Sequence, residues 1–209
     1  GIELMTKLFT ENNVTFNGKY HQVSNMTLSP KAIQAPHPPL WIGARGPKAI
    51  RRAAEIGANL MTTLGPDPAP LYIDTLKELG KDPTNFKIAQ LRMVYCADSE
   101  DQAWEDIQHH LAHVFGYYEA VLKEAGDVEG DELSMPYSSP EEIRDSVLAE
   151  TAIMAGTVEQ VSDKISDFKK NFECTDFILS SHFAGIDPRK SSYSNALFAK
   201  HVMPKFKGS

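Results

Sequence analysis

The alternation of short apolar runs with helical patterns is the feature that most restricts the fold of this chain. Four apolar runs, at residues 40–43, 58–64, 87–97 and 176–183, each lie next to a segment with helical periodicity. Strands and helices in this order are typical of α/β proteins, in which crossover helices join the strands of a parallel sheet. A complete eight-stranded barrel of the TIM type needs about 250 residues. We therefore expect half of a (β/α)8 barrel, or an open four-stranded sheet.

Capping and turn residues locate the other elements. Asn17 and Gly18 separate two short alternating runs, which predicts a small hairpin after an opening helix. Gly57 is placed to end the helix that precedes it, and Thr157 with Gln160 forms a capping-box pattern. Helices are expected at about 47–56, 71–79, from a Ser99 cap to Ala125, before Gly156, after Thr157 and at 194–203.

Residues 126–140 are acidic and rich in Gly, Pro and Ser, which predicts a surface loop or insertion. Around it we expect a single α/β domain over residues 1–209. The chain begins with Gly1 rather than methionine, and its first residues have the pattern of the end of a helix. We interpret the sequence as a piece of something longer.

Composition and charge exclude several classes of function. The chain is 42% hydrophobic and 23% charged, which is ordinary for a globular domain. A net charge of −7 with scattered basic residues argues against a nucleic-acid partner. Cys96 and Cys174 are too far apart to indicate a disulfide framework or a zinc site, and they fit a reducing cytoplasm. No apolar run reaches the roughly 18 residues that span a bilayer, so no membrane partner is expected.

Three histidines are candidates for metal ligands or functional groups. His109 and His113 are one helical turn apart, a spacing that metal ligands use. The sequence offers no carboxylate or cysteine at a matching distance, so no metal site is predicted. His182 follows the last apolar run, at the end of a strand where barrel enzymes keep functional groups.

The turn between the run at 40–43 and the next helix is the clearest candidate for a site. It contains Gly43, Ala44, Arg45 and Gly46, and the helix begins at Pro47. A helix N-terminus offers free amides and a favourable dipole to an anion, and glycine lets the backbone approach closely. Proline at the first helical position loses no hydrogen bond, and arginine adds a charge-assisted contact. An ordinary βα turn has the same pattern, so these residues alone leave both interpretations open.

Blocks along nearly the whole chain resemble the C-terminal part of the luciferase-like monooxygenase family. In the family's order they are FNGKYHQVSNMTLSPKAIQAPHPPLWIGARGPKAIRRAAEIGANLM, MVYCADSEDQA, AGTVEQVSDKISDF, DFILS and FAKHVMPKF. Members are flavin- or deazaflavin-dependent enzymes built on an eight-stranded α/β barrel. The resemblance implies that the turn holds a cofactor phosphate, with Thr62 and Thr63 on the ligand-binding rim. The cofactor-binding residues it implies are Gly43, Ala44, Arg45, Gly46, Pro47, Ala49, Thr62 and Thr63.

The resemblance also implies the chemistry and the partners. We expect reduced FMN, supplied by a separate flavin reductase, and oxidation of a small organic substrate by dioxygen. An F420-dependent oxidoreductase of the same superfamily is the alternative, as is a non-catalytic flavin-binding relative. The first half of the family's barrel, which forms much of the substrate pocket, has no counterpart here. No catalytic residue is therefore predicted, and the chain alone is expected to be inactive.

A half-barrel leaves two strand edges unpaired, here expected at residues 40–43 and 177–181. Exposed edges present rows of free backbone donors and acceptors, which invite pairing with another chain. Two-fold symmetry is the simplest way to hide both edges. The sequence therefore predicts a homodimer or another homo-oligomer.

Overall fold

The computed structural model describes residues 1–63, 67–125 and 139–206. Contacts within the chain separate two compact units, Gly1–Trp41 and Ile42–Ser209. The insertion predicted at 126–140 falls almost entirely on residues 126–138, outside the described part. It stays a prediction, as does the single domain over residues 1–209.

The first unit contains one helix and one hairpin. Helix α1 (Ile2–Thr10) is followed by β1 (Val14–Asn17) and β2 (Gln22–Met26), which pair antiparallel. The predicted hairpin is confirmed, although its turn is longer than the Asn-Gly pair and is closed by the Gly18 amide donating to the His21 carbonyl at 2.9 Å. Helix ends leave carbonyl groups without intrahelical partners. The Lys31 ammonium donates to two of them near the end of α1, those of Leu8 and Glu11.

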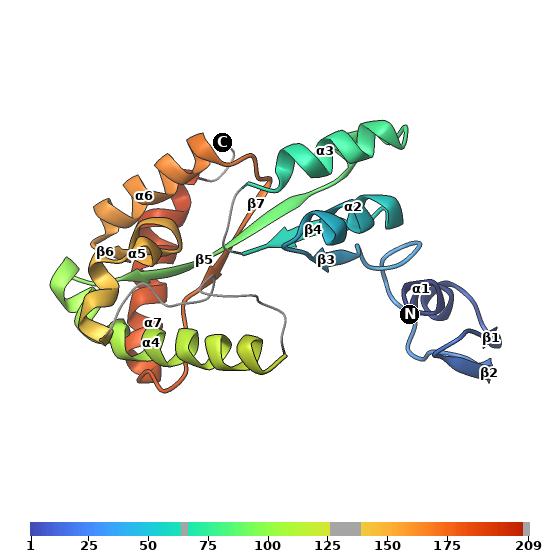
Figure 1. The fold of residues 1–209 in the computed structure, drawn as a ribbon, viewed down its shortest axis with the longest axis horizontal. Helices are drawn as coiled ribbons and strands as arrows, with labels where there is room; N and C mark the ends of the chain where they lie inside the picture. The colour runs from blue at the N-terminus through green and yellow to red at the C-terminus, as the bar shows by residue number, and fades with distance from the viewer. Residues whose placement is uncertain (64–66, 126–138, 207–209) are drawn as a thin grey trace. The chain divides into compact units, whose positions relative to one another are not determined.

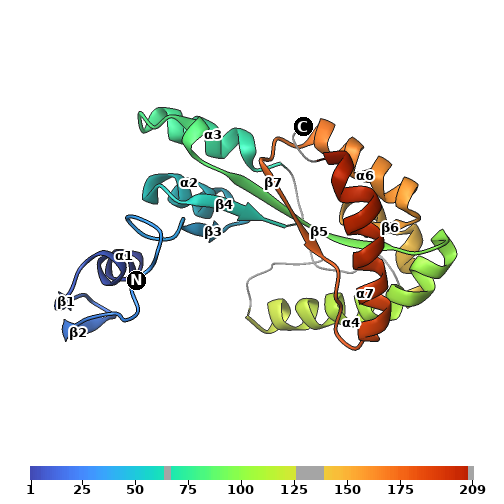
Figure 2. The same ribbon diagram turned by 180° about the vertical axis from the view of Figure 1, so that it is seen from behind.

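The second unit is built on a sheet whose longest strand lies at its centre (Figures 1 and 2). This strand, β5, pairs in parallel with three others. Met93 pairs with both Ile153 and Ser180, so β6 and β7 lie on opposite edges of β5. β4 pairs with the first residues of β5 on the edge that β6 occupies further along, and β3 lies next to β4. The strands are β3 (Trp41–Gly43), β4 (Asn59–Thr62), β5 (Ile88–Cys96), β6 (Ile153–Gly156) and β7 (Asp176–Ser180).

The sheet has five strands where about four were predicted, because β6 was missed. The segment Ile153–Gly156 has only four residues, follows helix α5 (Val147–Thr151) almost directly, and contains alanine and glycine, which strands disfavour. Its pairing with Met93–Cys96, far away in the sequence, makes it a strand, and all four of its residues are buried. The α/β class is confirmed, and within the described residues the strands form an open sheet rather than a closed barrel.

Helices pack on the sheet in three apolar clusters. α2 and α3 cover β4, with Leu60 and Tyr72 fully buried between them. α4 packs around Tyr95 and Ile153, and α6 packs with the C-terminal segment around Val94. No helix in the described part of the chain is long and apolar enough to cross a membrane. The helical bounds are α2 Pro47–Ile56, α3 Ala69–Glu78, η1 Pro83–Asn85, α4 Glu100–Ala125, η3 Pro140–Asp145, α6 Val158–Asn171, α7 Pro188–Leu197, η4 Phe198–Val202 and η5 Met203–Phe206.

The predicted helix ends agree with the structure where a local capping residue marked them. Gly57 has φ 78°, in the left-handed region, and its amide donates to the Ala53 and Ala54 carbonyls. Thr157 and Gln160 form both bonds of a capping box at the start of α6. Ser99 accepts from the Gln102 amide at 3.1 Å, which caps α4. These short-range signals needed no tertiary information.

Candidate functional site

The turn at residues 43–47 joins β3 to the N-terminus of α2, as the sequence predicts. Ala44 is buried, and its amide donates to the Met61 carbonyl at 3.0 Å. This bond ties the turn to β4 and removes one amide from the set that could bind a ligand. The amides of Arg45 and Gly46 donate to no acceptor within the described residues, and both residues are exposed.

The N-terminus of α2 has the features of an anion site. Gly46 caps the helix without a side-chain hydrogen bond, and Pro47 takes the first helical position. The first turn contains no acidic residue, so nothing there offsets the positive end of the helix dipole. Arg45 and Lys48 add two exposed cations beside it. The Ala49 amide is already used, since it donates to the Gly46 carbonyl at 3.0 Å.

The two glycines of the turn are not required by the packing of the chain itself. Gly46 has φ −90° and ψ 158°, a conformation open to any residue. A Cβ atom added there would meet no atom within 4 Å, and one at Gly43 would only touch the Met61 methyl at 3.9 Å. The space above Gly46 is thus open to a group from a ligand. A phosphate fits this combination of free amides, positive charge and unobstructed backbone.

Thr62 and Thr63 stand at the end of β4, which neighbours β3. Thr62 is buried and pairs with Gln90 in the sheet, whereas Thr63 is exposed just beyond the strand. Of these two predicted site residues, Thr63 is the one whose side chain is open to solvent.

Two buried polar residues beneath this strand end, Arg92 and Gln90, were missed by the sequence analysis. Arg92 is 1% exposed and donates through Nη1 to the Thr63 carbonyl at 3.0 Å, which fixes the end of β4. Its guanidinium also lies 4.6 Å from the ring centre of Phe168. Burial lowers the pKa of Arg92, opposed by the charges of Cys174 and Asp67. The signal was present, since two polar residues at positions i and i+2 of an apolar strand share one face.

The candidate histidines His109 and His182 contact residues outside this turn. His109 Nε2 is 3.6 Å from a Glu141 carboxylate oxygen, and both side chains are exposed. His182 Nδ1 is 3.0 Å from the Ser191 hydroxyl oxygen. Within the described ranges no three His, Cys, Asp or Glu side chains come together as a possible metal site.

The structure brings the predicted residues Gly43 to Pro47 together with the end of β4. The Ala44–Met61 hydrogen bond connects the turn to β4, and the Arg92–Thr63 hydrogen bond ties the end of β4 to β5. The arrangement has donors and cations for an anion and an open approach to them. Within the described residues the turn itself holds no acid, base or nucleophile suited to bond-making chemistry. The turn is therefore suited to binding an anion rather than to catalysis.

The known proteins similar to this chain include two kinds of oxidoreductase. A curated relative, the oxygenase component of a flavin-dependent trigonelline monooxygenase from Acinetobacter baylyi, is 25% identical over 201 residues, which is 92% of this chain and 55% of the relative. An F420-dependent glucose-6-phosphate dehydrogenase from Nakamurella multipartita is 39% identical over 75 residues, covering 36% of this chain and 21% of that protein. The chain thus spans about half of the length of the first relative.

Solved structures agree on the fold. A crystal structure of a monooxygenase from Streptomyces bottropensis superposes with a TM-score of 0.76 at 22% identity, over 98% of this chain and 59% of that one. The sequence model of the luciferase-like monooxygenase family matches residues 2–172, which is most of the chain. This chain therefore belongs to the luciferase-like monooxygenase family.

Proposed function

We propose that this chain forms the phosphate-holding part of an FMN-dependent monooxygenase that oxidises a small organic substrate. The observation that carries the proposal is the N-terminus of α2, where the exposed Arg45 and Gly46 have amides with no acceptor within the described residues and no atom lies within 4 Å of a Cβ built at Gly46. When bound, reduced FMN would supply the electrons with which dioxygen oxidises the substrate. A separate flavin reductase would deliver the reduced cofactor.

Residues of the turn and of the neighbouring strand end would have different roles in binding the phosphate. The amides of Arg45 and Gly46 would donate to the phosphate, and the Arg45 guanidinium would close over it with a charge-assisted contact. Ala44 and Pro47 shape the turn, and Ala49 belongs to the first turn of the helix behind it. The Thr63 hydroxyl is exposed at the neighbouring strand end and is available for a further contact. Arg92 would act indirectly, by holding that strand end in place.

F420 is the alternative cofactor, because it also carries a phosphate that the same turn would hold. The support for FMN is that the flavin-dependent relative matches 92% of the chain, whereas the F420-dependent dehydrogenase matches 36%. The F420-dependent protein is, however, the more identical one over its shorter match. A non-catalytic, flavin-binding role is the third possibility. The free thiols of Cys96 and Cys174 support a reducing, cytoplasmic setting.

Titration with FMN, riboflavin and F420 tests the proposal. Flavin fluorescence should show FMN binding about tenfold or more tightly than riboflavin, since charge-assisted hydrogen bonds to the phosphate are strong. Arg45→Ala should weaken FMN binding, whereas Arg52→Ala, an exposed arginine further along the same helix, should not. Equal affinity for riboflavin and FMN would overturn the phosphate site. Tighter binding of F420 than of FMN would favour the alternative cofactor.

Catalysis needs a separate assay, because binding alone does not establish it. Oxygen uptake would be followed with NADH, a flavin reductase and the purified chain. We expect FMN binding without turnover by the chain alone. Measurable oxidation of an added organic substrate would contradict this expectation.

We also propose that the chain associates with itself. Within the described residues β3 pairs with β4 alone and β7 with β5 alone, so each has one open edge. Every residue of β7 is only half-buried. Pairing of these edges between two copies would satisfy the open backbone groups. Light scattering should give about twice the chain mass of 23.2 kDa, and a clean monomer mass at micromolar concentration would refute the association.

A further inference from the structure

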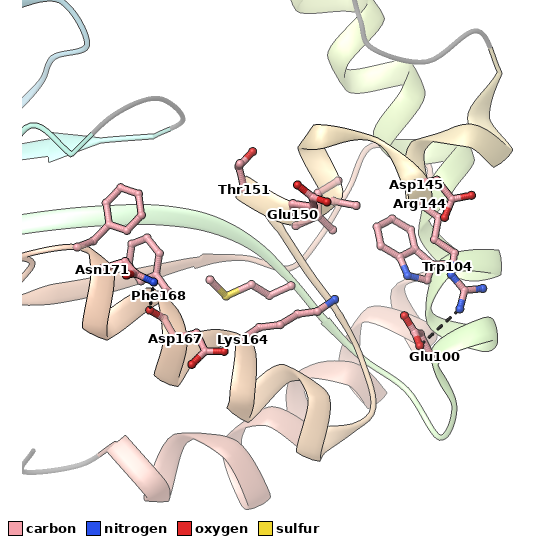
Figure 3. Close-up of a pocket in the computed structure, with 14 residues that line it drawn as sticks. Glu100, Trp104, Arg144, Asp145, Glu150, Thr151, Lys164, Asp167, Phe168 and Asn171 are labelled. Carbon is pink, nitrogen blue, oxygen red and sulfur yellow. Dashed lines mark hydrogen bonds and ion pairs between the residues drawn. The ribbon is translucent and has the colours of Figure 1, made fainter.

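Acidic and basic side chains are unevenly distributed over the second unit. The chain has a net charge of −7, and carboxylates gather where α4, η3, α5, β6 and α6 surround a cavity of about 510 Å³ (Figure 3). Four carboxylates line this cavity, those of Glu100, Asp145, Glu150 and Asp167. Between Glu11 and Glu55, by contrast, the sequence contains no Asp or Glu. Nearly all of α2 falls in this stretch, so it is a basic element of an acidic chain.

The cations of this region belong to the turn and to α2. They are Arg45, Lys48, Arg51 and Arg52, and all four are exposed. Arg51 is paired with Glu78 of α3, where Nη1 lies 3.5 Å from a carboxylate oxygen. Within the described residues the other three form no ion pair. Their charges are therefore available to a partner from outside the chain.

Two of these cations share one side of α2 with an exposed apolar residue. Lys48, Arg52 and Ile56 follow one another at intervals of four residues, which places them along the same side of the helix. We call these three residues the α2 stripe. Ile56 is 37% exposed, whereas the buried residues of α2 pack into the apolar cluster with α3 and β4. The α2 stripe thus joins two positive charges to one apolar side chain.

The stability of the helix does not account for these two cations. Lys48 lies in the first turn of α2, at the positive end of the helix dipole, where a cation is unfavourable. Lys48 and Arg52 are four residues apart, and like charges at this spacing repel each other. Both arrangements disfavour the helix on its own. An anionic partner would relieve both.

A protein surface fits the α2 stripe better than a nucleic acid does. Arginine beside exposed apolar side chains is typical of protein interfaces. Surfaces that bind nucleic acids carry clustered cations along the phosphate backbone. On α2 the cations end at Arg52, and Glu55 and Ile56 follow. A phosphate chain that continued past Arg52 would meet a negative charge and an apolar group.

We propose that the α2 stripe is a docking surface for a partner protein with an acidic segment that also carries an apolar side chain. Carboxylates of that segment pair with Lys48 and Arg52, and its apolar side chain packs on Ile56. The stripe begins directly after the turn at 43–47, so the partner stands beside the cofactor phosphate, as a protein that delivers reduced FMN must. This role of the partner rests on the proposed function, whereas the docking surface itself does not.

Fluorescence anisotropy with labelled peptides tests the docking surface. The probe is a short helical peptide of glutamate and leucine, compared with the same peptide carrying glutamine in place of glutamate and with a single-stranded DNA of similar length. We expect saturable binding of the glutamate peptide that weakens as NaCl is added, because salt screens exposed charges. The glutamine peptide should not bind, and the DNA should bind more weakly than the glutamate peptide.

Substitutions in the α2 stripe separate specific docking from general attraction. Arg52→Gln and Ile56→Ser should each weaken binding of the glutamate peptide about threefold or more. Lys200→Gln removes an exposed lysine of η4, outside the stripe, and should leave the affinity unchanged. Circular dichroism would establish that each variant is folded. FMN affinity should not change in the Arg52 and Ile56 variants, so a failure to bind FMN would refute the phosphate site and leave the docking surface in place.

The docking surface is overturned by any of three results. These are the absence of saturable, salt-sensitive binding of the glutamate peptide up to millimolar concentration, unchanged affinity in the folded Arg52→Gln variant, and tighter binding of the DNA than of the peptide.

Discussion

Gly156 controls the junction between β6 and α6, and its replacement by alanine should destabilise the chain through two effects. Gly156 has φ 143°, a region that favours glycine, so a side chain there strains the backbone. An added Cβ would also stand 2.5 Å from Gln160 Oε1 and 3.1 Å from Gln160 Cβ. Gln160 Oε1 accepts from the Thr157 amide in the capping box, so the clash would displace a helix cap.

The size of the effect follows from these two contributions. Backbone strain of this kind costs roughly 1–3 kcal/mol, and loss of a helix cap costs about 1 kcal/mol. Gly156→Ala should therefore lower the free energy of unfolding by about 2–4 kcal/mol, or Tm by roughly 5–15 °C for a chain of this length. Gly80→Ala is the matched control, because Gly80 has φ 69° but no atom within 4 Å of the added Cβ. Gly80→Ala should therefore show the cost of the backbone strain without the clash.

A double-mutant cycle with Gln160→Ala separates the two effects. Removing the Gln160 amide relieves the clash at 2.5 Å, so Gly156→Ala should cost about 1 kcal/mol less in that background. Urea unfolding followed by circular dichroism measures each variant. If the costs of Gly156→Ala and Gln160→Ala simply add within about 0.5 kcal/mol, the proposed link between the glycine and the cap is refuted.

Buried tyrosine and cysteine side chains give further predictions. Tyr72→Phe should lower the free energy of unfolding by about 1–3 kcal/mol in urea unfolding, because the buried Ala58 carbonyl loses the Tyr72 hydroxyl as donor; an unchanged value would show that this bond is dispensable. Burial raises the pKa of Tyr72 to about 12, so stability should fall as pH rises above about 10, where the unfolded phenol ionises and the folded one does not. An absorbance titration that shows every tyrosine ionising together near pH 10 would contradict this. Burial likewise raises the pKa of Cys96 to about 11, so its thiol should resist Ellman's reagent at neutral pH until the chain unfolds, and fast labelling of the folded chain would disprove that protection.

The elements predicted correctly are those encoded by neighbouring residues. The helix at 47–56 has proline at its start and Gly57 at its end, and both signals act within one turn. The capping box of Thr157 is equally local. The turn at 43–47 lies between two such elements, so its place in the chain could be predicted together with them.

The parts that were missed depend on contacts between distant residues. β6 is a strand because it pairs with Met93–Cys96, some sixty positions earlier, and its own composition does not favour a strand. The Ala44 amide is used by Met61, a bond that the sequence of the turn does not encode. Trp104 has sequence surroundings that resemble ordinary core. Only the packed structure shows that Trp104 Nε1 and Arg92 Nε, both buried, have no acceptor in the described part of the chain.

Chemical shifts of the glycine amides test most directly whether the turn holds a cofactor phosphate. With [15N]glycine labelling, FMN and inorganic phosphate should each shift the amide resonances of Gly43 and Gly46. Gly57 lies at the C-terminus of α2, and Gly80 lies just beyond the C-terminus of α3. Their amide resonances should not shift and serve as internal controls. Riboflavin, which lacks the phosphate, should leave the Gly46 resonance nearly unchanged. A Gly46 amide that does not move with millimolar FMN, or that moves equally with riboflavin, would contradict the account of α2 as the phosphate site.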